Sequence, residues 1–277
     1  MKSYLLCCVP RSGSWLLADL LEQTDAAGRP EEYFRPDYRK QWSQEWHIPA
    51  EGPYSRYVTA ALANTATANG VFGVKTHWYQ LEWFVSQLRA LPGTGRDASD
   101  AALIEQWLPH PRYVHLHRDD TVRQAISYYR AAYSDRWFDL IEEDGDRLIT
   151  PLPMPEKPGW AHIRYLEESV ISHEQRWHEF FAQSGIVPLD IRYEDMVLAY
   201  KQTLQRVLDF IGVQLPAGTP LPSPRLKKQA DEETDRLVQK YLAHRDSVEP
   251  RPLNLGDQRA RVAPRPLHSA DADQRSP

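Results

Sequence analysis

Short hydrophobic runs alternate with longer segments of helical periodicity along this chain of 277 residues. Residues 4–9 are continuously apolar, as expected for a strand that is buried on both faces of a parallel sheet. The segment that follows spaces leucines three and four positions apart, which predicts a helix with one apolar stripe. The pattern predicts strands over 4–9, 71–75, 112–118 and 187–192. It predicts helices over 16–24, 57–69, 78–91, 119–133, 160–183, 199–211 and 230–244, with partly helical structure over 33–46.

Strands that alternate with helices predict a three-layer α/β domain around a central, mainly parallel sheet. Residues 1–245 form one domain in this interpretation. Acidic residues followed by prolines predict an insertion or lid over 139–159, and the Pro-, Arg- and Asp-rich stretch 246–277 predicts a flexible tail. Ligands of such folds bind beyond the carboxyl ends of the strands. The site is therefore expected in the loops after Val9, Lys75, Arg118 and Arg192.

The chain carries 33 Lys and Arg against 38 Asp and Glu, a net charge of −5. No global positive field draws it to nucleic acid, so an anionic ligand must be held by a local cluster. Its two cysteines, Cys7 and Cys8, are adjacent and cannot build a disulfide framework, which fits a reducing compartment. With no apolar stretch of about 18 residues and no signal peptide, the sequence predicts a cytoplasmic protein without a membrane span.

The first predicted strand leads into the loop Pro10-Arg11-Ser12-Gly13-Ser14 at the start of a helix. Backbone amides at such a turn, together with the helix dipole, favour an anion. Gly13 lets the backbone approach a ligand, and the side chains beside it add one cation and two hydroxyls. A capped turn without a ligand is the alternative. The loop is shorter than a Walker A motif and lacks its lysine, which argues against nucleoside triphosphate hydrolysis.

The third predicted strand ends at Arg118, and Asp119 is expected to cap the next helix. Ser127 follows nine residues after Arg118, a spacing that lets a strand, a turn and a helix fold both side chains onto one phosphate. In the alternative, Arg118 pairs with Asp119 or Asp120, and Ser127 bonds to its own helix backbone.

Five blocks of the chain, in order over roughly residues 2–245, resemble the bacterial trehalose 2-sulfotransferase family. The resemblance implies a P-loop-like sulfotransferase fold. It also implies transfer of the sulfuryl group of 3′-phosphoadenosine 5′-phosphosulfate (PAPS) to a carbohydrate hydroxyl, with adenosine 3′,5′-bisphosphate as product, and it suggests a homodimer. The blocks are Tyr4-Leu5-Leu6 with Arg11-Ser12-Gly13-Ser14, Gly28-Arg29-Pro30-Glu31-Glu32-Tyr33-Phe34, Phe72-Gly73-Val74-Lys75, His117-Arg118-Asp119-Asp120 with Gln124-Ala125-Ile126-Ser127-Tyr128-Tyr129-Arg130-Ala131, and Lys228-Gln229-Ala230-Asp231.

By position, the resemblance assigns residues of this chain to the two anionic ends of PAPS. Arg118 and Ser127 would hold the 3′-phosphate. Lys228 stands where the family has Arg and would close over the nucleotide, or else is a solvated residue before a helix. Lys75 is expected to help neutralise the donor, and His77 to contact donor or acceptor or to be only a strand-end residue. The 5′-phosphosulfate would be held by Arg11, Ser12, Gly13 and Ser14.

Glu32 falls on the position of the family's proposed catalytic base. An acceptor hydroxyl attacks sulfur well only if its proton leaves as the S–O bond forms, so a nearby carboxylate suits this role. Wrapped by Tyr33, Phe34 and Trp42, the Glu32 carboxyl is expected to have a pKa raised toward neutrality. Glu31 is the adjacent competitor, and an ordinary surface glutamate is the alternative.

Two positions depart from the family pattern. Trp15 stands where Thr is common, and Arg29 replaces an acidic residue of the trehalose-specific enzyme with a donor-only cation. An acceptor other than unmodified trehalose is therefore expected. Core or dimer contacts are the alternative for the aromatic residues. The predicted acceptor-binding residues are Arg29, Glu31, Tyr33, Phe34 and Trp42, with Tyr38 and Trp46 in the same aromatic set.

The sequence thus predicts a PAPS-dependent O-sulfotransferase that acts on a sugar or small-molecule acceptor. Two alternatives are a non-catalytic protein that binds PAPS or its product, and a kinase-like nucleotide enzyme. The kinase is disfavoured by the missing loop lysine and by the lack of an acidic strand end of the Walker B type. No metal is expected, because the sequence places no third ligand near His115 and His117.

Overall fold

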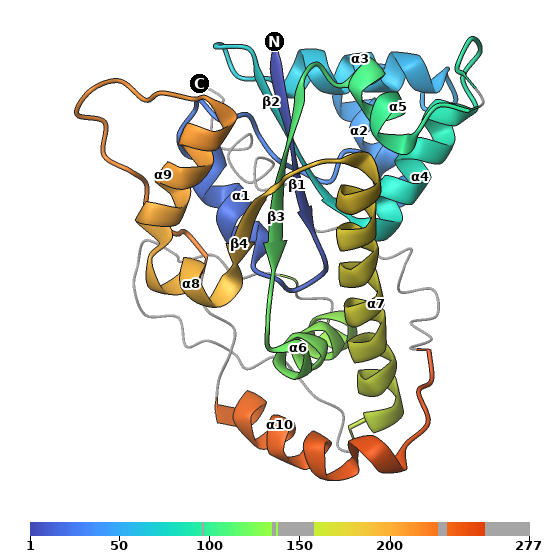
Figure 1. The fold of residues 1–277 in the computed structure, drawn as a ribbon, viewed down its shortest axis with the longest axis vertical. Coiled ribbons are helices and arrows are strands. Elements are labelled where there is room, and N and C mark those ends of the chain that lie inside the picture. The colour runs from blue at the N-terminus through green and yellow to red at the C-terminus, as the bar shows by residue number, and fades with distance from the viewer. Residues whose placement is uncertain (96, 135–136, 138–157, 227–231, 253–277) are drawn as a thin grey trace, which may run out of the picture.

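Four parallel strands form the centre of the fold in a computed structural model, which describes residues 1–95, 97–134, 137, 158–226 and 232–252. The strand order is β2 (Val71–His77), β1 (Lys2–Cys8), β3 (Pro111–His117) and β4 (Leu189–Arg192). Cys8 lies beside both His77 and Leu116, so the carboxyl ends of β1, β2 and β3 meet at one edge (Figure 1). The predicted α/β class and parallel sheet are confirmed.

Helices cover both faces of this sheet because alternate residues of β1 point to opposite sides. Leu6 and Cys8 pack with α1 (Ser14–Glu22) and α9 (Tyr200–Ile211) on one face. Leu5 and Cys7 belong to a second cluster on the other face, which confirms the three-layer arrangement (Figure 1). The helices that contribute to the second cluster include α2 (Arg39–Glu45), α3 (Tyr54–Thr65), α4 (Trp78–Arg89), α5 (Asp100–Trp107) and α7 (Trp160–Ser184).

A smaller cluster lies below the sheet, where α6 (Thr121–Ser134), the lower part of α7 and α10 (Glu232–His244) pack together (Figure 1). The chain then continues through the 3-10 turn Arg245–Ser247 along α7. Arg164 donates to the carbonyl of Val248 at 2.6 Å, and the amide of Arg251 donates to Ala161 at 2.9 Å. The first residues of the predicted tail therefore bind α7, and 253–277 lie outside the described residues.

Two short helices were not predicted, α5 and α8 (Tyr193–Leu198), while the 3-10 turn Pro36–Tyr38 and α2 (Arg39–Glu45) account for the partly helical stretch. The cap of α6 also differs from the prediction, since Asp120 Oδ1 accepts from the amide of Arg123 at 2.8 Å. Asp119 instead pairs with Arg192 at 3.1 Å. The predicted lid at 139–159 lies almost wholly outside the described residues.

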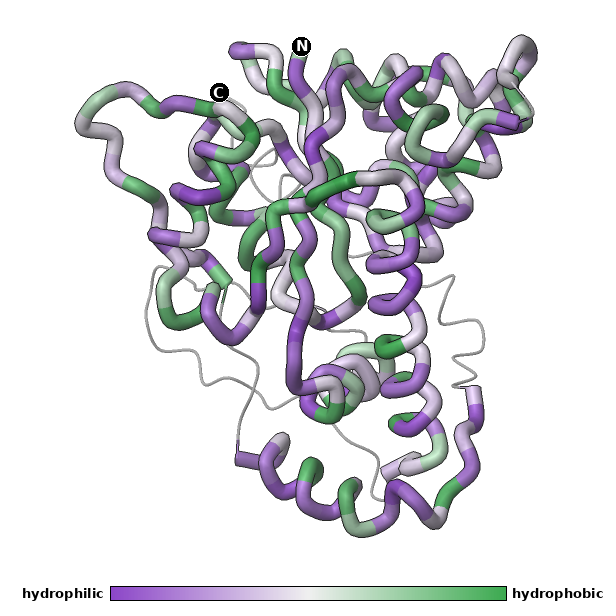
Figure 2. Tube along the Cα trace, in the orientation of Figure 1, coloured by the Kyte–Doolittle hydropathy of each residue, from purple (hydrophilic) through white to green (hydrophobic). Residues whose placement is uncertain are grey.

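Hydrophobic residues concentrate in the central strands, and the chain turns hydrophilic where β3 ends (Figure 2). None of the helices in the described part of the chain has the length and apolarity needed to cross a bilayer.

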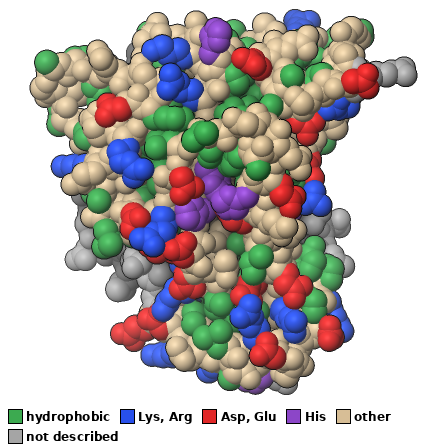
Figure 3. Space-filling model, viewed as in Figure 1, with side chains coloured by type: hydrophobic (Ala, Val, Ile, Leu, Met, Phe, Trp, Pro, Cys, Tyr) green, Lys and Arg blue, Asp and Glu red, His purple; other side chains and the backbone are tan. Residues whose placement is uncertain are grey.

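Three histidines gather near the carboxyl end of β3, on the face of the molecule shown in Figure 3. His115 is buried between two carboxylates, with Nε2 2.6 Å from Glu174 and Nδ1 3.0 Å from Asp190. His117 lies 3.1 Å from the other oxygen of Asp190, and His178 contacts the ring of His115. The cluster thus links β3 and β4 to α7.

Candidate active site

A cavity of about 360 Å³ opens at the edge of the sheet where β1, β2 and β3 end. Its walls come from the loop after β1, the loop that contains Glu32, the end of β2, the start of α4, α6 and α8. This is the position expected for a ligand in a parallel α/β fold. Arg11, Glu32, Arg118 and Ser127 all line it, so the structure brings together residues that are far apart in the sequence.

The loop after β1 has an unusual backbone that brings it close to α8. Arg11 and Gly13 both have a positive φ, +66° and +88°. A Cβ atom on Gly13 would lie 2.5 Å from the ring of Tyr193, so only glycine fits beneath this tyrosine. Gly13 and Ser14 line the cavity, whereas the side chain of Ser12 is completely buried and is not part of the described lining.

Arg11 reaches across the cavity to α6. Its Nε donates to Ser127 Oγ at 2.9 Å, and its Nη1 donates to the carbonyl of Trp137. The predicted alternative for Ser127, a bond to its own helix, is therefore replaced by a contact with the loop after β1. Arg123, Ser127 and Arg130 share one face of α6 because they are four and three residues apart, and all three line the cavity.

Arg118 enters the cavity from the end of β3 and is held against α8. Its guanidinium lies over the ring of Tyr193 at 4.6 Å, and its Nε is 3.9 Å from Glu194. Asp119 and Asp120 pair with other arginines, so the alternative that either one binds Arg118 is wrong. Arg118 Nε is buried and has no hydrogen-bond acceptor among the described residues. A buried donor in this state suits an anionic ligand.

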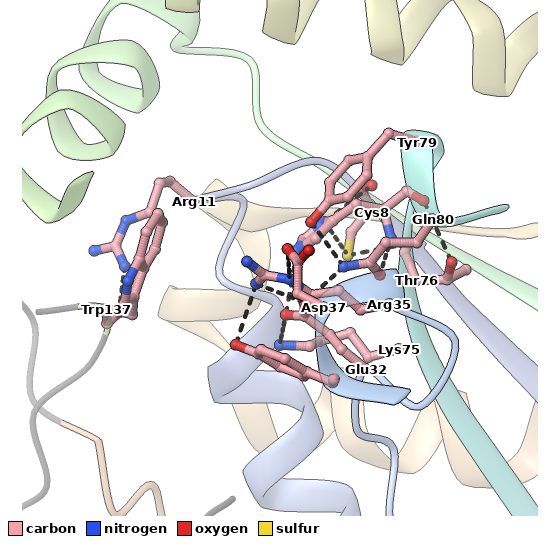
Figure 4. A network of polar contacts seen from close by, with 12 residues as sticks. Cys8, Arg11, Glu32, Arg35, Asp37, Lys75, Thr76, Tyr79, Gln80 and Trp137 are labelled. Atoms are coloured by element: carbon pink, nitrogen blue, oxygen red, sulfur yellow. Dashed lines mark hydrogen bonds and ion pairs between the residues drawn. The ribbon is translucent and has the colours of Figure 1, made fainter. Parts of the chain in front are cut away.

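Four donors surround the carboxylate of Glu32, whose side chain is almost completely buried (Figure 4). Oε1 lies 2.9 Å from Lys75 Nζ and 3.5 Å from His77 Nε2. Oε2 accepts from Gln80 Nε2 at 2.6 Å and from Arg35 Nη1 at 3.4 Å. The structure thus gives Glu32 specific partners, unlike an ordinary surface glutamate.

The prediction that the pKa of Glu32 is raised is wrong. Burial does raise it, but the charges of Lys75, His77 and Arg35 outweigh burial and hold the pKa well below its ordinary value. The expectation took account of burial beside aromatic residues but not of the three cations around the carboxyl. Glu32 is therefore ionised at neutral pH.

Lys75 lies on the buried side of Glu32 and not at the position expected for contact with the sulfuryl donor. Its side chain is fully buried, and its Nζ sits 3.1 Å from the ring centre of Trp15, a cation–π contact that explains why an aromatic residue is useful at position 15. Lys75 is not among the residues that line the cavity. The predicted contact between Lys75 and the donor is therefore corrected to an ion pair with Glu32.

The predicted acceptor residues lie mostly in the core beside the site. Tyr33, Phe34 and Trp42 are buried in the cluster under α3 and α4, with Phe34 stacked on Phe84 at 3.9 Å. The alternative that these aromatics are core contacts is thus the correct one in the described structure. Trp46 and Tyr38 belong to the same cluster, and Tyr38 also lines the cavity.

The two charged residues of this predicted set also lie outside the lining of the cavity. Arg29 is exposed, and its carbonyl accepts from the hydroxyl of Tyr33. Glu31 is buried and pairs through its backbone with β2, where its carbonyl accepts from the amide of Lys75 at 3.1 Å. The position of Lys228 lies outside the described residues.

Several residues that line the site were not predicted. Arg35 and Tyr79 face Glu32, while Arg130 is buried and donates to Thr234 of α10 at 2.6 Å. The helical spacing of Arg123, Ser127 and Arg130 was visible in the sequence and could have identified the two arginines. Nothing in the local sequence indicates that Gln80 contacts Glu32, because the contact joins a loop to a helix 48 residues later.

Comparison with known proteins identifies the family of the chain. The family model described as Stf0 sulphotransferase matches residues 3–244. The chain therefore belongs to the Stf0 sulphotransferase family, and it is a sulfotransferase.

Two relatives are similar to most of the chain. Trehalose 2-sulfotransferase of Mycobacterium tuberculosis (strain ATCC 35801 / TMC 107 / Erdman) is 28% identical over 267 residues, which cover 88% of this chain and 95% of the relative. The protein of the same name from Mycolicibacterium smegmatis (strain ATCC 700084 / mc(2)155) is 26% identical over 272 residues, with 89% and 97% covered. The resemblance to the trehalose 2-sulfotransferase family is confirmed.

Two solved sulfotransferase domains are also similar over most of their length. The domain from the Synechococcus PCC 7002 olefin synthase is 17% identical, with a TM-score of 0.42, and the match covers 94% of this chain and 92% of that one. The domain from the curacin biosynthetic pathway is 16% identical, with a TM-score of 0.44 and coverage of 94% and 95%.

Proposed function

We propose that this sulfotransferase moves the sulfuryl group of PAPS to a hydroxyl of a carbohydrate or other small molecule, with Glu32 as the base. The observation that carries the proposal is that one cavity holds a cationic end, with Arg11 and Arg118, and an ionised carboxylate, Glu32. The donor PAPS is anionic at both ends, so it needs the cationic end of the cavity. The acceptor hydroxyl must lose a proton, so it needs the carboxylate.

The cationic end fits the two anionic groups of PAPS. Arg118 and Ser127 would bind the 3′-phosphate, since both line the cavity and Arg118 Nε is a buried donor without an acceptor among the described residues. The backbone of the loop at Gly13 and the hydroxyl of Ser14 would bind the 5′-phosphosulfate at the start of α1. Arg11 belongs to the loop proposed to bind the 5′-phosphosulfate and also contacts Ser127, which is proposed to bind the 3′-phosphate. Its guanidinium would therefore lie between the two anionic groups.

Glu32 would accept the proton of the acceptor hydroxyl as the new S–O bond forms and the bond from sulfur to the phosphate oxygen breaks. Adenosine 3′,5′-bisphosphate leaves, and Arg11 together with the loop amides stabilises the charge that develops on its 5′-phosphate. A carboxylate of low pKa suffices as the base, because the hydroxyl proton becomes strongly acidic once its oxygen bonds to sulfur.

The residues around the cavity and the names of the relatives support a carbohydrate as the class of acceptor. The two curated relatives are named for trehalose, and the cavity beside Glu32 offers Tyr38, Tyr79 and Tyr128, whose rings and hydroxyls suit a sugar. Arg29 does not line the cavity, so its charge no longer supports the exclusion of unmodified trehalose. Trehalose therefore belongs in any panel of acceptors.

The proposal also includes a cellular compartment and an oligomeric state. Both cysteines are buried and unpaired, which supports a reducing compartment such as the cytoplasm. The homodimer stays a prediction that sedimentation analysis of the purified protein would test.

Turnover of PAPS separates this function from its main alternative, a protein that only binds PAPS. Product mass spectrometry detects a sulfated acceptor only if the chain is catalytic. A chain that binds adenosine 3′,5′-bisphosphate but sulfates no member of a broad panel of sugars and hydroxylated metabolites would support the binding protein instead.

A further inference from the structure

The four donors to Glu32 fall into two pairs that differ in distance and in position. Lys75 and Gln80 make the short contacts, at 2.9 and 2.6 Å, and both are outside the described lining of the cavity. His77 and Arg35 make the long contacts, at 3.5 and 3.4 Å, and both line the cavity. The short contacts thus hold the carboxylate on its buried side. The long contacts lie on its cavity side, from which an acceptor hydroxyl must approach.

His77 is fixed in this front position by contacts on its other side. Its Nδ1 lies 3.4 Å from the carbonyl oxygen of Cys8 and 3.4 Å from Cys8 Sγ, because His77 pairs with Cys8 in the sheet. The same carbonyl accepts from Trp177 Nε1 at 3.0 Å. Gln80 also accepts from the amide of His77 at 3.0 Å, which joins the backbone of His77 to the residue that holds Glu32. These contacts favour the orientation in which the ring faces Glu32.

A neutral ring in this position would face Glu32 unfavourably. With Nδ1–H directed at the Cys8 carbonyl, a neutral imidazole would present the lone pair of Nε2 to a carboxylate oxygen. The other neutral tautomer, protonated at Nε2, would present the lone pair of Nδ1 to the Cys8 carbonyl oxygen. Only the imidazolium donates to Glu32 Oε1 and to the Cys8 carbonyl at the same time. Besides Glu32 and Cys8, the charged or titratable groups near His77 are Lys75 on its own strand, Arg35 across Glu32, Tyr79, whose ring stacks on His77, and His173 of α7.

We propose that His77 is a positioning residue for the base: as an imidazolium it aims Oε1 of Glu32 at the acceptor hydroxyl. Sulfuryl transfer then requires an ionised Glu32 and a protonated His77 at the same time. The proposal deepens the proposed function and rests on it, since it needs Glu32 to accept the proton.

The pH dependence gives the sharpest signature. Burial lowers the pKa of His77, but Cys8 and Glu32 outweigh burial and raise it to about 9. In the wild-type enzyme, kcat/KM should therefore fall as the pH rises through about 9. In His77→Gln, an amide can still donate to Glu32 but does not titrate, so this basic limb should disappear while kcat/KM at neutral pH drops by up to about 10²-fold.

His173→Gln is the matched control, because His173 lies close to His77 but makes no hydrogen bond or ion pair with Glu32 in the described part of the chain, and it should keep the basic limb. Binding of adenosine 3′,5′-bisphosphate, measured by calorimetry, should be the same in all three proteins. A wild-type profile that stays flat through pH 9, or a His77→Gln variant with a wild-type profile, would overturn the proposal.

A second measurement does not depend on turnover. In NMR titrations of carboxyl carbons, Glu32 should protonate at a higher pH in His77→Gln than in the wild type, because one of its cations is gone. Equal midpoints would overturn the role of His77 even if the protein transfers sulfuryl groups. If no acceptor is sulfated but the midpoints differ, the proposed function fails while the pairing of His77 with Glu32 stands. His77→Asn serves for the same comparison if the Gln variant does not fold.

Discussion

Lys75 Nζ lies 2.9 Å from Glu32 Oε1, although the side chain of Lys75 has no exposed surface. Removing two charges from water is costly, and a buried pair often contributes little to stability compared with apolar residues of similar size. The pair is therefore better explained by what it does to Glu32. The charge of Lys75 helps to keep the carboxylate ionised although it is almost completely buried, as the proposed role of Glu32 requires.

Replacing Glu32 should abolish most of the turnover without disturbing the donor site. Glu32→Gln keeps the shape of the side chain but cannot accept the proton, so kcat should fall by about 10²–10⁴-fold. Steady-state kinetics measures this loss, and calorimetry with adenosine 3′,5′-bisphosphate should give a wild-type affinity. Glu31→Gln is the matched control, because Glu31 is also buried but lies outside the lining of the cavity. If Glu31→Gln is inactive and Glu32→Gln is not, the base has been assigned to the wrong carboxylate.

Removing Lys75 should destabilise the protein, because it leaves the Glu32 carboxylate without its shortest ion pair. Breaking a buried pair costs about 3–5 kcal/mol, and Lys75→Met should lose a free energy of unfolding of this size in urea denaturation. Arg176→Met is the control, since Arg176 pairs with Glu82 on the surface and its loss should cost under about 1 kcal/mol.

The effect of Lys75→Met should also depend on pH. The pKa of Glu32 is lowered in the folded state, so its contribution to stability is present above its ordinary value of 4.5 and is lost as the pH falls through the folded pKa. The difference between wild type and Lys75→Met should therefore be largest near neutral pH and shrink in acid. A difference that does not change with pH would argue against a charge effect.

Arg118 should be responsible for recognition of the 3′-phosphate. Calorimetry should show that Arg118→Ala weakens the binding of adenosine 3′,5′-bisphosphate by about 1.5–3 kcal/mol, the size of a charge-assisted hydrogen bond. Binding of 5′-AMP, which has no 3′-phosphate, should change little. Arg112→Ala removes an arginine from the opposite end of β3 and should leave both affinities unchanged. Equal affinity of the wild type for the two nucleotides would contradict the assignment.

His115 should make the stability of the fold depend on pH. Burial lowers the pKa of His115, but hydrogen bonds and charge interactions with Glu174 and Asp190 outweigh burial and raise it above 6.5. A raised folded pKa means that the stabilisation is complete below about pH 6.5 and is lost as the pH rises through the folded pKa. Urea denaturation across this range should show the decline in the wild type and a flatter dependence in His115→Asn. Equal slopes in the two proteins would rule out His115 as the cause.

The parts of the fold that follow from local patterns were predictable from the sequence. The continuous apolar run 4–9 predicted a strand covered on both faces, and β1 spans Lys2–Cys8. The loop at Gly13 and the helix that follows were predictable from the interruption of this run and from the spacing of the leucines after it. Helix α5 was missed despite a usable signal, since Ser99 caps it by accepting from the amide of Ala102. Helix α8 has only six residues and starts directly after β4, so its periodicity was too short to detect.

The parts of the site that depend on tertiary contacts were not predictable. The sequence placed Glu32 in an aromatic segment, and from this alone its pKa was expected to rise. The direction of the pKa shift was reversed mainly by Lys75 and His77, which lie 43 and 45 residues further along the chain and reach Glu32 only through the packing of β2 against the loop. Similarly, Trp42 could have faced a substrate or the core, and only the packed structure distinguishes the two.

Product analysis with PAPS tests the central claim most directly. The protein is incubated with PAPS and a panel of sugars that includes trehalose, together with hydroxylated metabolites, and the products are identified by mass spectrometry beside a Glu32→Gln control. The predicted result is an O-sulfated acceptor and adenosine 3′,5′-bisphosphate in equal amounts with the wild type, and both reduced by about 10²-fold or more with Glu32→Gln. Sulfation that proceeds at the same rate in the two proteins would contradict the assignment of Glu32 as the base.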